Sequence, residues 1–274
     1  MSQATAQQVT GTLGSPSATS AIGNQQLPPP DPAFGGVIKN DALQSKPWWA
    51  PRVVPPKGAP NVLLIITDDA GFGVPSTFGG VIPTPTMDRI AKEGLRYNRV
   101  FSTALCSPTR AALMTGKYPA RLRITDWIPG AMPDNPKLVV PDWTKFLPTS
   151  ETSLATVFRA AGYATGTIGK WHLGGPATYP EKHGFDENIA GTDKAQSPSY
   201  HAPYNIPTLK PEGKEGEYLT DRLGDEAARF IERHQARPFF LYLPHFAVHT
   251  PIQGRADLVA NYQARIREGM RHRN

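Results

Sequence analysis

A single cysteine stands directly before a stretch that is typical of a helix, and an arginine follows four residues later. Cys106 is the only cysteine among 274 residues. Ser107 and Pro108 suit the N-cap and the first position of a helix that ends at Gly116. The free N–H groups at such a helix start favour a thiolate or a bound anion. Arg110 is electrostatically disfavoured there unless a fixed anion lies nearby, although a small buried cysteine beside a surface arginine is the plainer alternative.

A pair of adjacent carboxylates follows the aliphatic run 62–66. Asp68 and Asp69 repel each other when both are charged, and a hard divalent cation with oxygen ligands is the usual remedy. Gly71 and Gly73 would allow the backbone to approach such an ion closely. A solvated turn is the alternative interpretation of the same two residues.

Lysine and histidine side chains follow two further apolar segments. Lys170 and His172 are two residues apart, so they lie on the same side of an extended chain. A lysine can hold an anion, and a histidine can transfer a proton near neutral pH. His245 and His249 are two more candidate acids, but lone histidines are more often structural.

The segments between these residues predict strands that alternate with helices. We expect strands at 62–66, 95–102, 163–169 and from 238 onward, and helices at 84–94, 107–116, 153–162 and 217–234. The aliphatic run 62–66 is expected to be buried on both faces. This order predicts an α/β fold with a mostly parallel sheet. Ligands bind beyond the carboxyl ends of the strands in such sheets, where the polar residues above would meet.

Composition excludes several classes of protein. The net charge of +6 comes with no interleaved aromatic pattern, so we expect no nucleic-acid partner. The run 62–66 is far shorter than the roughly 20 residues of a membrane-spanning helix, so we expect no membrane partner. One cysteine excludes an internal disulfide and a cysteine-based zinc site. The N-terminus lacks the pattern of an export signal, which predicts a cytoplasmic protein, or a periplasmic one if the start codon is mis-assigned.

The N-terminal part differs in composition from the rest. Residues 1–58 are rich in Ser, Thr, Gln, Gly and Pro, which predicts a disordered tail followed by an extended proline-rich arm. Residues 59–274 are expected to form the folded part, and the resemblance described next implies that it is the N-terminal portion of a catalytic domain.

Four segments, taken together, resemble the sulfatase family. The stretch "CSPTRAALMTGKYPAR" at 106–121 is similar to the family signature, in which Cys-x-Pro-x-Arg opens a longer run. "NVLLIITDDAGFG" at 61–73, "GYATGTIGKWHLGG" at 162–175 and "FFLYLPHFAVHTP" at 239–251 resemble other family blocks in the same order. The resemblance implies an alkaline-phosphatase-like α/β core, of which this chain would hold the N-terminal part.

The resemblance also implies a cofactor and a mechanism. Cys106 would be oxidised by a formylglycine-generating enzyme, and the hydrated aldehyde would attack an aryl or carbohydrate sulfate monoester. Asp68 and Asp69 would bind Ca²⁺, with Mg²⁺ as the alternative, together with the modified Cys106.

Four further residues carry family roles by the same resemblance. Arg110 and Lys170 would hold the diol and sulfate charges. His172 would remove a proton when the sulfated intermediate collapses. His249 would contact the sulfate or protonate the leaving oxygen.

One departure from the family pattern limits this expectation. Members of the family carry a later Asp-Asn pair that completes the metal site and a later lysine in the sulfate pocket. Nothing after Pro251 resembles these, so we expect a chain truncated at its C-terminus with about half a metal site. Two alternatives therefore stay open: a catalytically incomplete fragment, and a phosphomonoester or phosphonate hydrolase on the same core.

Overall fold

A four-stranded parallel sheet forms the centre of the molecule, with the strand order β4-β7-β5-β6. The computed structural model describes residues 9–21, 33–130, 135 and 137–265. The four strands are β4 (Val62–Ile66), β5 (Ala164–Ile168), β6 (Glu187–Ile189) and β7 (Phe239–Pro244). All three pairings in this sheet are parallel. The predicted α/β architecture with a mostly parallel sheet is confirmed.

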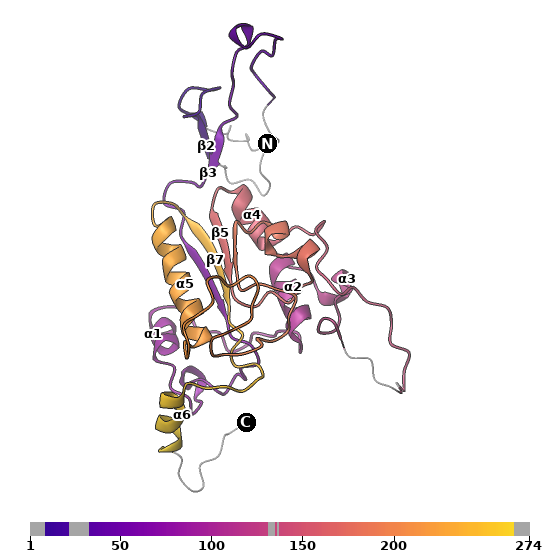
Figure 1. Cartoon of the computed structure of the whole chain (residues 1–274), viewed down its shortest axis with the longest axis vertical. Helices are drawn as coiled ribbons and strands as arrows, with labels where there is room; N and C mark the ends of the chain where they lie inside the picture. Colours follow the sequence, from indigo (N-terminus) through magenta and orange to yellow (C-terminus); the bar gives the residue numbers. More distant parts are fainter. Residues whose placement is uncertain (1–8, 22–32, 131–134, 136, 266–274) are drawn as a thin grey trace.

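Helices lie on both faces of this sheet (Figure 1). Helix α5 (Leu219–His234) covers one face, while α2 (Cys106–Thr115) and α4 (Leu154–Ala160) lie on the other. The remaining α-helices are α1 (Pro85–Glu93), α3 (Pro119–Leu122) and α6 (Ala256–Gln263). Short 3-10 helices are η1 (Ala42–Gln44), η2 (Ser76–Phe78), η3 (Pro176–Thr178) and η4 (Pro180–His183). The part of the chain that the structure describes holds no helix long and apolar enough to cross a membrane.

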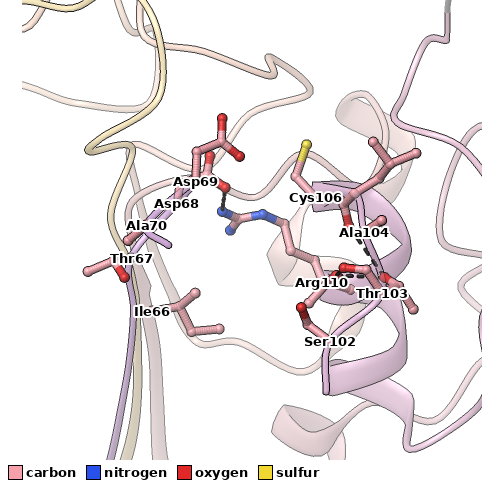
Figure 2. Close-up of a pocket in the computed structure, with 12 residues that line it drawn as sticks. Ile66, Thr67, Asp68, Asp69, Ala70, Ser102, Thr103, Ala104, Cys106 and Arg110 are labelled. Carbon is pink, nitrogen blue, oxygen red and sulfur yellow. Dashed lines mark hydrogen bonds and ion pairs between the residues drawn. The ribbon is translucent and has the colours of Figure 1, made fainter. Parts of the chain in front are cut away.

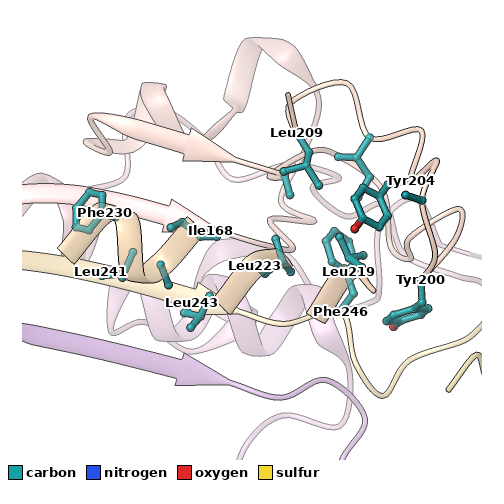
Figure 3. Close-up of a cluster of buried hydrophobic side chains, with 14 of the residues drawn as sticks. Ile168, Tyr200, Tyr204, Leu209, Leu219, Leu223, Phe230, Leu241, Leu243 and Phe246 are labelled. Atoms are coloured by element: carbon teal, nitrogen blue, oxygen red, sulfur yellow. The ribbon is translucent and has the colours of Figure 1, made fainter. Parts of the chain in front are cut away.

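Alternate residues of the central strands fill two separate cores. Leu241 on β7 packs with Leu223 and Phe230 of α5 on one face, in the cluster drawn in Figure 3. Tyr242, the next residue along β7, packs with Met114 of α2 on the other face. This alternation is what a pleated strand buried on both faces requires.

A glycine in β5 lets α5 approach the sheet. A Cβ atom at Gly166 would lie 2.5 Å from the ring of Phe230, so no larger residue fits there without displacement of that ring. The helix itself follows the predicted amphipathic pattern, with Leu219, Leu223 and Phe230 buried along one side.

Strand β4 differs from the expectation that both of its faces are buried. Val62, Leu64 and Ile66 are partly buried against the α2 face. Leu63 and Ile65 point to the α5 face but are 45% and 49% exposed, because α5 packs over β5 and β7. Among the described residues β4 pairs with β7 alone, so its other edge carries no strand. The prediction failed because an aliphatic run indicates which residues can be buried, not which neighbours are present.

Two other segments differ from or add to the sequence expectations. The predicted strand at 95–102 is wrong: this segment has no regular secondary structure, and Leu95 and Phe101 are 80% and 91% exposed. In the N-terminal region, β1 (Val9–Thr10), β2 (Thr19–Ala21) and β3 (Arg52–Val54) form a small separate sheet. The composition of that region did not indicate these strands. The domain boundary at residue 58 stays a prediction.

Candidate active site at the carboxyl edge of the parallel sheet

Backbone hydrogen bonds hold three strand ends together at the carboxyl edge of the sheet. The His245 N–H donates to the Ile66 carbonyl at 2.9 Å, which joins the ends of β4 and β7. The Lys170 N–H donates to the Pro244 carbonyl at 2.8 Å, which joins the ends of β5 and β7. Gly169 allows this approach, because it has φ +126° and a Cβ there would lie 2.0 Å from the Pro244 oxygen. The polar residues after these strands therefore meet, as the parallel order predicted.

Helix α2 begins two residues earlier than the sequence indicated. Leu105 is the N-cap and accepts the Thr109 N–H at 3.1 Å, so Cys106 is the first helical residue. The prediction of Ser107 as N-cap is wrong. Its buried hydroxyl instead accepts the Ile128 N–H at 3.0 Å and donates to the His172 carbonyl at 3.1 Å. Ser107 thus ties the start of α2 to the loops that follow α3 and β5.

A pocket of about 220 Å³ separates the end of β4 from the start of α2. Asp68 and Asp69 line one side, and Cys106, Thr109 and Arg110 line the other. Figure 2 shows the Arg110 side chain reaching from α2 toward Asp68, with the Cys106 sulfur beside it. Cys106 is a free, partly exposed thiol.

A buried charge cluster forms the floor of the site. The Asp68 carboxylate pairs with Lys170 through Nζ and Oδ2, and with Arg110 through Nη2 and Oδ1 at 3.3 Å. Arg110 Nη1 also donates to the Lys170 carbonyl at 2.8 Å. The relative exposures of Asp68, Arg110 and Lys170 are 5%, 2% and 0%. The fixed anion that Arg110 required at a helix start is therefore Asp68.

The cluster has more positive than negative charge. Asp68 carries one negative charge, whereas Arg110 and Lys170 carry two positive charges when both are protonated. Burial lowers the pKa of Lys170, and the neighbouring Arg110 guanidinium lowers it further. Arg110 Nε is buried and has no hydrogen-bond partner among the described residues. An anion in the pocket would supply the missing negative charge.

His172 lies behind the first turn of α2. Its Nε2 contacts the Ile128 carbonyl oxygen, and its Nδ1 lies 3.4 Å from Ser107 Oγ. Burial lowers the pKa of His172 to about 4, so the ring is neutral at pH 7. A neutral ring that donates from Nε2 to a carbonyl keeps its lone pair on Nδ1. His172 also has φ +56°, a left-handed conformation that is uncommon outside glycine.

His249 reaches the site from the loop after β7. Its Nε2 lies 3.7 Å from Asp69 Oδ2, and its side chain is 17% exposed. The Asp69 side chain is 62% exposed, and the backbone of Asp69, like that of His172, has a positive φ of 56°. The two adjacent aspartates therefore differ: Asp68 is held by buried cations, while Asp69 faces solvent beside His249.

The kind of ligand that these residues offer suits a calcium ion, but the number of ligands is too small. Carboxylate oxygens are suitable ligands, and Asp68 and Asp69 line the same pocket. Two carboxylates supply at most about four oxygens, whereas Ca²⁺ takes six to eight. The part of the chain that the structure describes contains no group of three or more potential His, Cys, Asp or Glu ligands. The described residues therefore provide at most part of a metal site.

Two residues of the site were missed by the sequence analysis. The Tyr242 hydroxyl lies 3.5 Å from Arg110 Nη1, and strand alternation alone would have placed that side chain toward α2. Ile128 binds both Ser107 and His172 through its backbone, and no side-chain signal marks such a role.

Comparison with known proteins identifies relatives over most of the chain. The family model described as Sulfatase matches residues 60–271. An arylsulfatase from Hemicentrotus pulcherrimus is 34% identical over 254 residues, which cover 81% of this chain and 43% of that protein. The N-acetylgalactosamine-6-sulfatase of Homo sapiens is 37% identical over 222 residues, which cover 70% of this chain and 40% of that protein. The chain spans about two fifths of the length of these two relatives.

Solved structures show the same architecture. Ps i-CgsB superposes with a TM-score of 0.61 at 30% identity, over 76% of this chain and 49% of that one. BT4656, solved with its substrate D-glucosamine-2-N,6-O-disulfate, gives a TM-score of 0.59 at 27% identity, over 76% of this chain and 38% of that one. The predicted alkaline-phosphatase-like α/β fold is confirmed by these likenesses. On the family match and the curated relatives together, the chain belongs to the sulfatase family.

Proposed function

We propose that these residues belong to a sulfuric ester hydrolase that cleaves aryl or carbohydrate sulfate monoesters. The observation that carries this proposal is the buried Arg110–Asp68–Lys170 cluster beside Cys106 at one pocket of a sulfatase-family chain. The names of the relatives support the substrate class, because they include an arylsulfatase and an N-acetylgalactosamine-6-sulfatase.

The charge of the pocket suits the proposed substrate. A sulfate monoester carries one negative charge, and the cluster has one positive charge in excess when its groups are ionised. Arg110 lines the pocket, and Lys170 supplies positive charge from the buried side. Fixed cations in a poorly solvated site stabilise the charge that develops when the ester bond breaks.

Cys106 is the proposed nucleophile after conversion to formylglycine, whose hydrated aldehyde supplies a hydroxyl that attacks sulfur. Its place at the first turn of α2 gives it free backbone N–H groups and the positive end of the helix dipole. Neutral His172 holds an accepting Nδ1 beside that turn. It is the proposed base that would take the proton of the second hydroxyl, so that the C–O bond to sulfate breaks, sulfate leaves and the aldehyde forms again. His249, whose Nε2 lies 3.7 Å from Asp69 Oδ2, is the proposed acid for the leaving oxygen.

A divalent cation, Ca²⁺ or Mg²⁺, is part of the proposal. Asp68 and Asp69 would provide carboxylate oxygens to it together with the modified Cys106. Such an ion would neutralise charge on the nucleophile and on the sulfate.

The test is co-expression of this chain with a formylglycine-generating enzyme, followed by peptide mass spectrometry and a hydrolysis assay. We expect a mass loss at Cys106 that corresponds to exchange of the thiol for an aldehyde, and turnover of 4-nitrophenyl sulfate. Cys106→Ala is the control and should give no turnover.

Phosphate and phosphonate esters of the same alcohol test the alternative hydrolase. Faster turnover of these than of the sulfate would overturn the proposed substrate class. A converted Cys106 with no turnover of any ester would show that the chain by itself is catalytically incomplete.

A further inference from the structure

The loop that carries His249 is held from two sides. On one side its backbone pairs with Asp68: the Asp68 N–H donates to the Ala247 carbonyl at 2.8 Å, and the Val248 N–H donates to the Asp68 carbonyl at 2.7 Å. On the other side the Tyr200 hydroxyl donates to the carbonyl oxygen of His249 itself, at 2.9 Å. The first contact fixes the residues before His249, and the second fixes the peptide that carries its imidazole.

Tyr200 is itself rigidly held. Its N–H donates to Gln253 Oε1 at 2.8 Å, and its carbonyl accepts the Leu219 N–H at the start of α5, also at 2.8 Å. Its ring stacks on Tyr218 at 6.1 Å between centroids, and the Tyr218 hydroxyl donates to the Gln253 carbonyl at 3.0 Å. Tyr200 is only 2% exposed. The start of α5 and the His249 loop are therefore joined through one closed network.

We propose that Tyr200 is a positioning residue that holds the His249 imidazole beside Asp69 through its hydrogen bond to the His249 carbonyl. The inference rests on the proposed function of His249 as the acid of the reaction. No sequence motif marks Tyr200, which lies in an irregular segment 49 residues before His249.

Three physical features support this role. The hydroxyl stays a donor at ordinary pH, because burial raises the pKa of Tyr200 above its usual value. Among the described residues, Nδ1 of His249 contacts only its neighbour Thr250, at 3.0 Å from the Thr250 carbonyl oxygen, so no contact of Nδ1 with a residue distant in sequence fixes the ring. A cavity of about 170 Å³, lined by Tyr200, Tyr218 and His249, leaves room for the loop to move if the bond is lost.

The test compares two tyrosine-to-phenylalanine variants. Tyr200→Phe removes the bond to His249, whereas Tyr204→Phe removes a hydroxyl that donates to the Glu217 carbonyl at 3.1 Å. Both rings are buried in the same cluster, and Figure 3 shows them at the same end of it, so the two changes are matched in size and burial. The readout is the ¹⁵N–¹H spectrum of the histidine rings in the unconverted chain, with the His249 signals assigned from His249→Asn.

We expect Tyr200→Phe to shift or broaden the His249 ring signals and Tyr204→Phe to leave them in place. Unchanged His249 signals in Tyr200→Phe, or equal changes in both variants, would overturn the proposal. Gln253→Ala is a second variant at an exposed position and should move the same signals, so a Tyr200→Phe chain that fails to fold does not end the test. If Gln253→Ala then leaves the signals in place, the proposal is wrong.

The activity readout separates this inference from the proposed function. In a converted, active protein, Tyr200→Phe should lower kcat on the order of tenfold or more with little change in KM, since displacement of a reacting group by about 1 Å can cost up to a hundredfold. Absence of turnover in the converted, unsubstituted protein would show that the chain by itself is catalytically incomplete, but the ring spectrum would still decide the role of Tyr200.

Discussion

Protonation of His172 should be a main cause of acid instability in this protein. The side chain is fully buried, and burial lowers its pKa to about 4, whereas a histidine in an unfolded chain has a pKa of about 6.5. Between these two values the unfolded chain binds a proton that the folded chain excludes, so the free energy of unfolding rises with pH in this window. The stability due to the neutral ring is complete above pH 6.5 and is lost as the pH falls toward about 4.

The size of this effect follows from the difference between the two pKa values. At about 1.4 kcal/mol per pKa unit, a fall from 6.5 to about 4 corresponds to about 3 kcal/mol of unfolding free energy. This is a large fraction of the roughly 5–15 kcal/mol that holds a typical domain folded.

The perturbation is His172→Asn, which removes the titrating group at a position with φ +56° that asparagine tolerates. The assay is urea unfolding of both proteins at pH 7.5, 5.5 and 4.5, followed by tryptophan fluorescence. The variant should be less stable at pH 7.5, because Ile128 and Ser107 lose their contacts with the ring. The gap in unfolding free energy between the two proteins should then narrow by about 2.5 kcal/mol from pH 7.5 to pH 4.5.

Two other histidines set the background of that experiment. Burial also lowers the pKa values of His183 and His245, so both proteins should lose stability in acid. Only the difference in unfolding free energy between the two proteins, followed as a function of pH, reports on His172. Parallel pH curves for the two proteins would refute the reasoning, because they would show that His172 binds its proton equally well in both states.

Three further outcomes are expected. Asp68→Asn should cost about 3–5 kcal/mol of unfolding free energy, because Arg110 and Lys170 lose their buried counter-charge. Asp69→Asn, at an exposed side chain, should change the unfolding free energy by no more than about 0.5 kcal/mol. Equal losses for the two variants in urea unfolding would contradict the buried cluster. Cys106→Ala should change the unfolding free energy by no more than about 1 kcal/mol and should abolish turnover of 4-nitrophenyl sulfate. Turnover equal to that of the unsubstituted protein would exclude Cys106 as the nucleophile. In calorimetric titration this chain should bind Ca²⁺ far more weakly than a full-length relative, and an appended segment with an Asp-Asn pair should tighten binding; equally tight binding without it would show a complete site.

The parallel sheet and the meeting of its polar ends could be predicted because both depend on local signals. Strands β5 and β7 are buried throughout, and the glycine after α4 has the positive φ expected of a helix stop. Once the strands are parallel, their carboxyl ends must lie at one edge. Asp68 and Lys170 then come together even though they are 102 residues apart in the chain.

The errors arose where the outcome depends on distant neighbours. Ser107 and Pro108 have the local chemistry of a helix start, but the Ser107 hydroxyl is used by Ile128 and His172, and the helix begins at Cys106 instead. Segment 95–102 has the composition of a strand, but a strand forms only where a partner strand offers its backbone groups.

Arg110 shows how far the sequence can lead and where structure is needed. Its place in the first turn of a helix required a fixed anion, but only the fold shows that the anion is Asp68 and that Lys170 contacts the same carboxylate. Each carboxylate oxygen of Asp68 is therefore already contacted by a cation. A metal ion that binds this carboxylate must share or replace those contacts, and a displaced Lys170 or Arg110 would need a new anionic partner because both are buried. A sulfate group in the pocket would be such a partner, so occupancy by a cation and by an anionic ester should favour each other at this site.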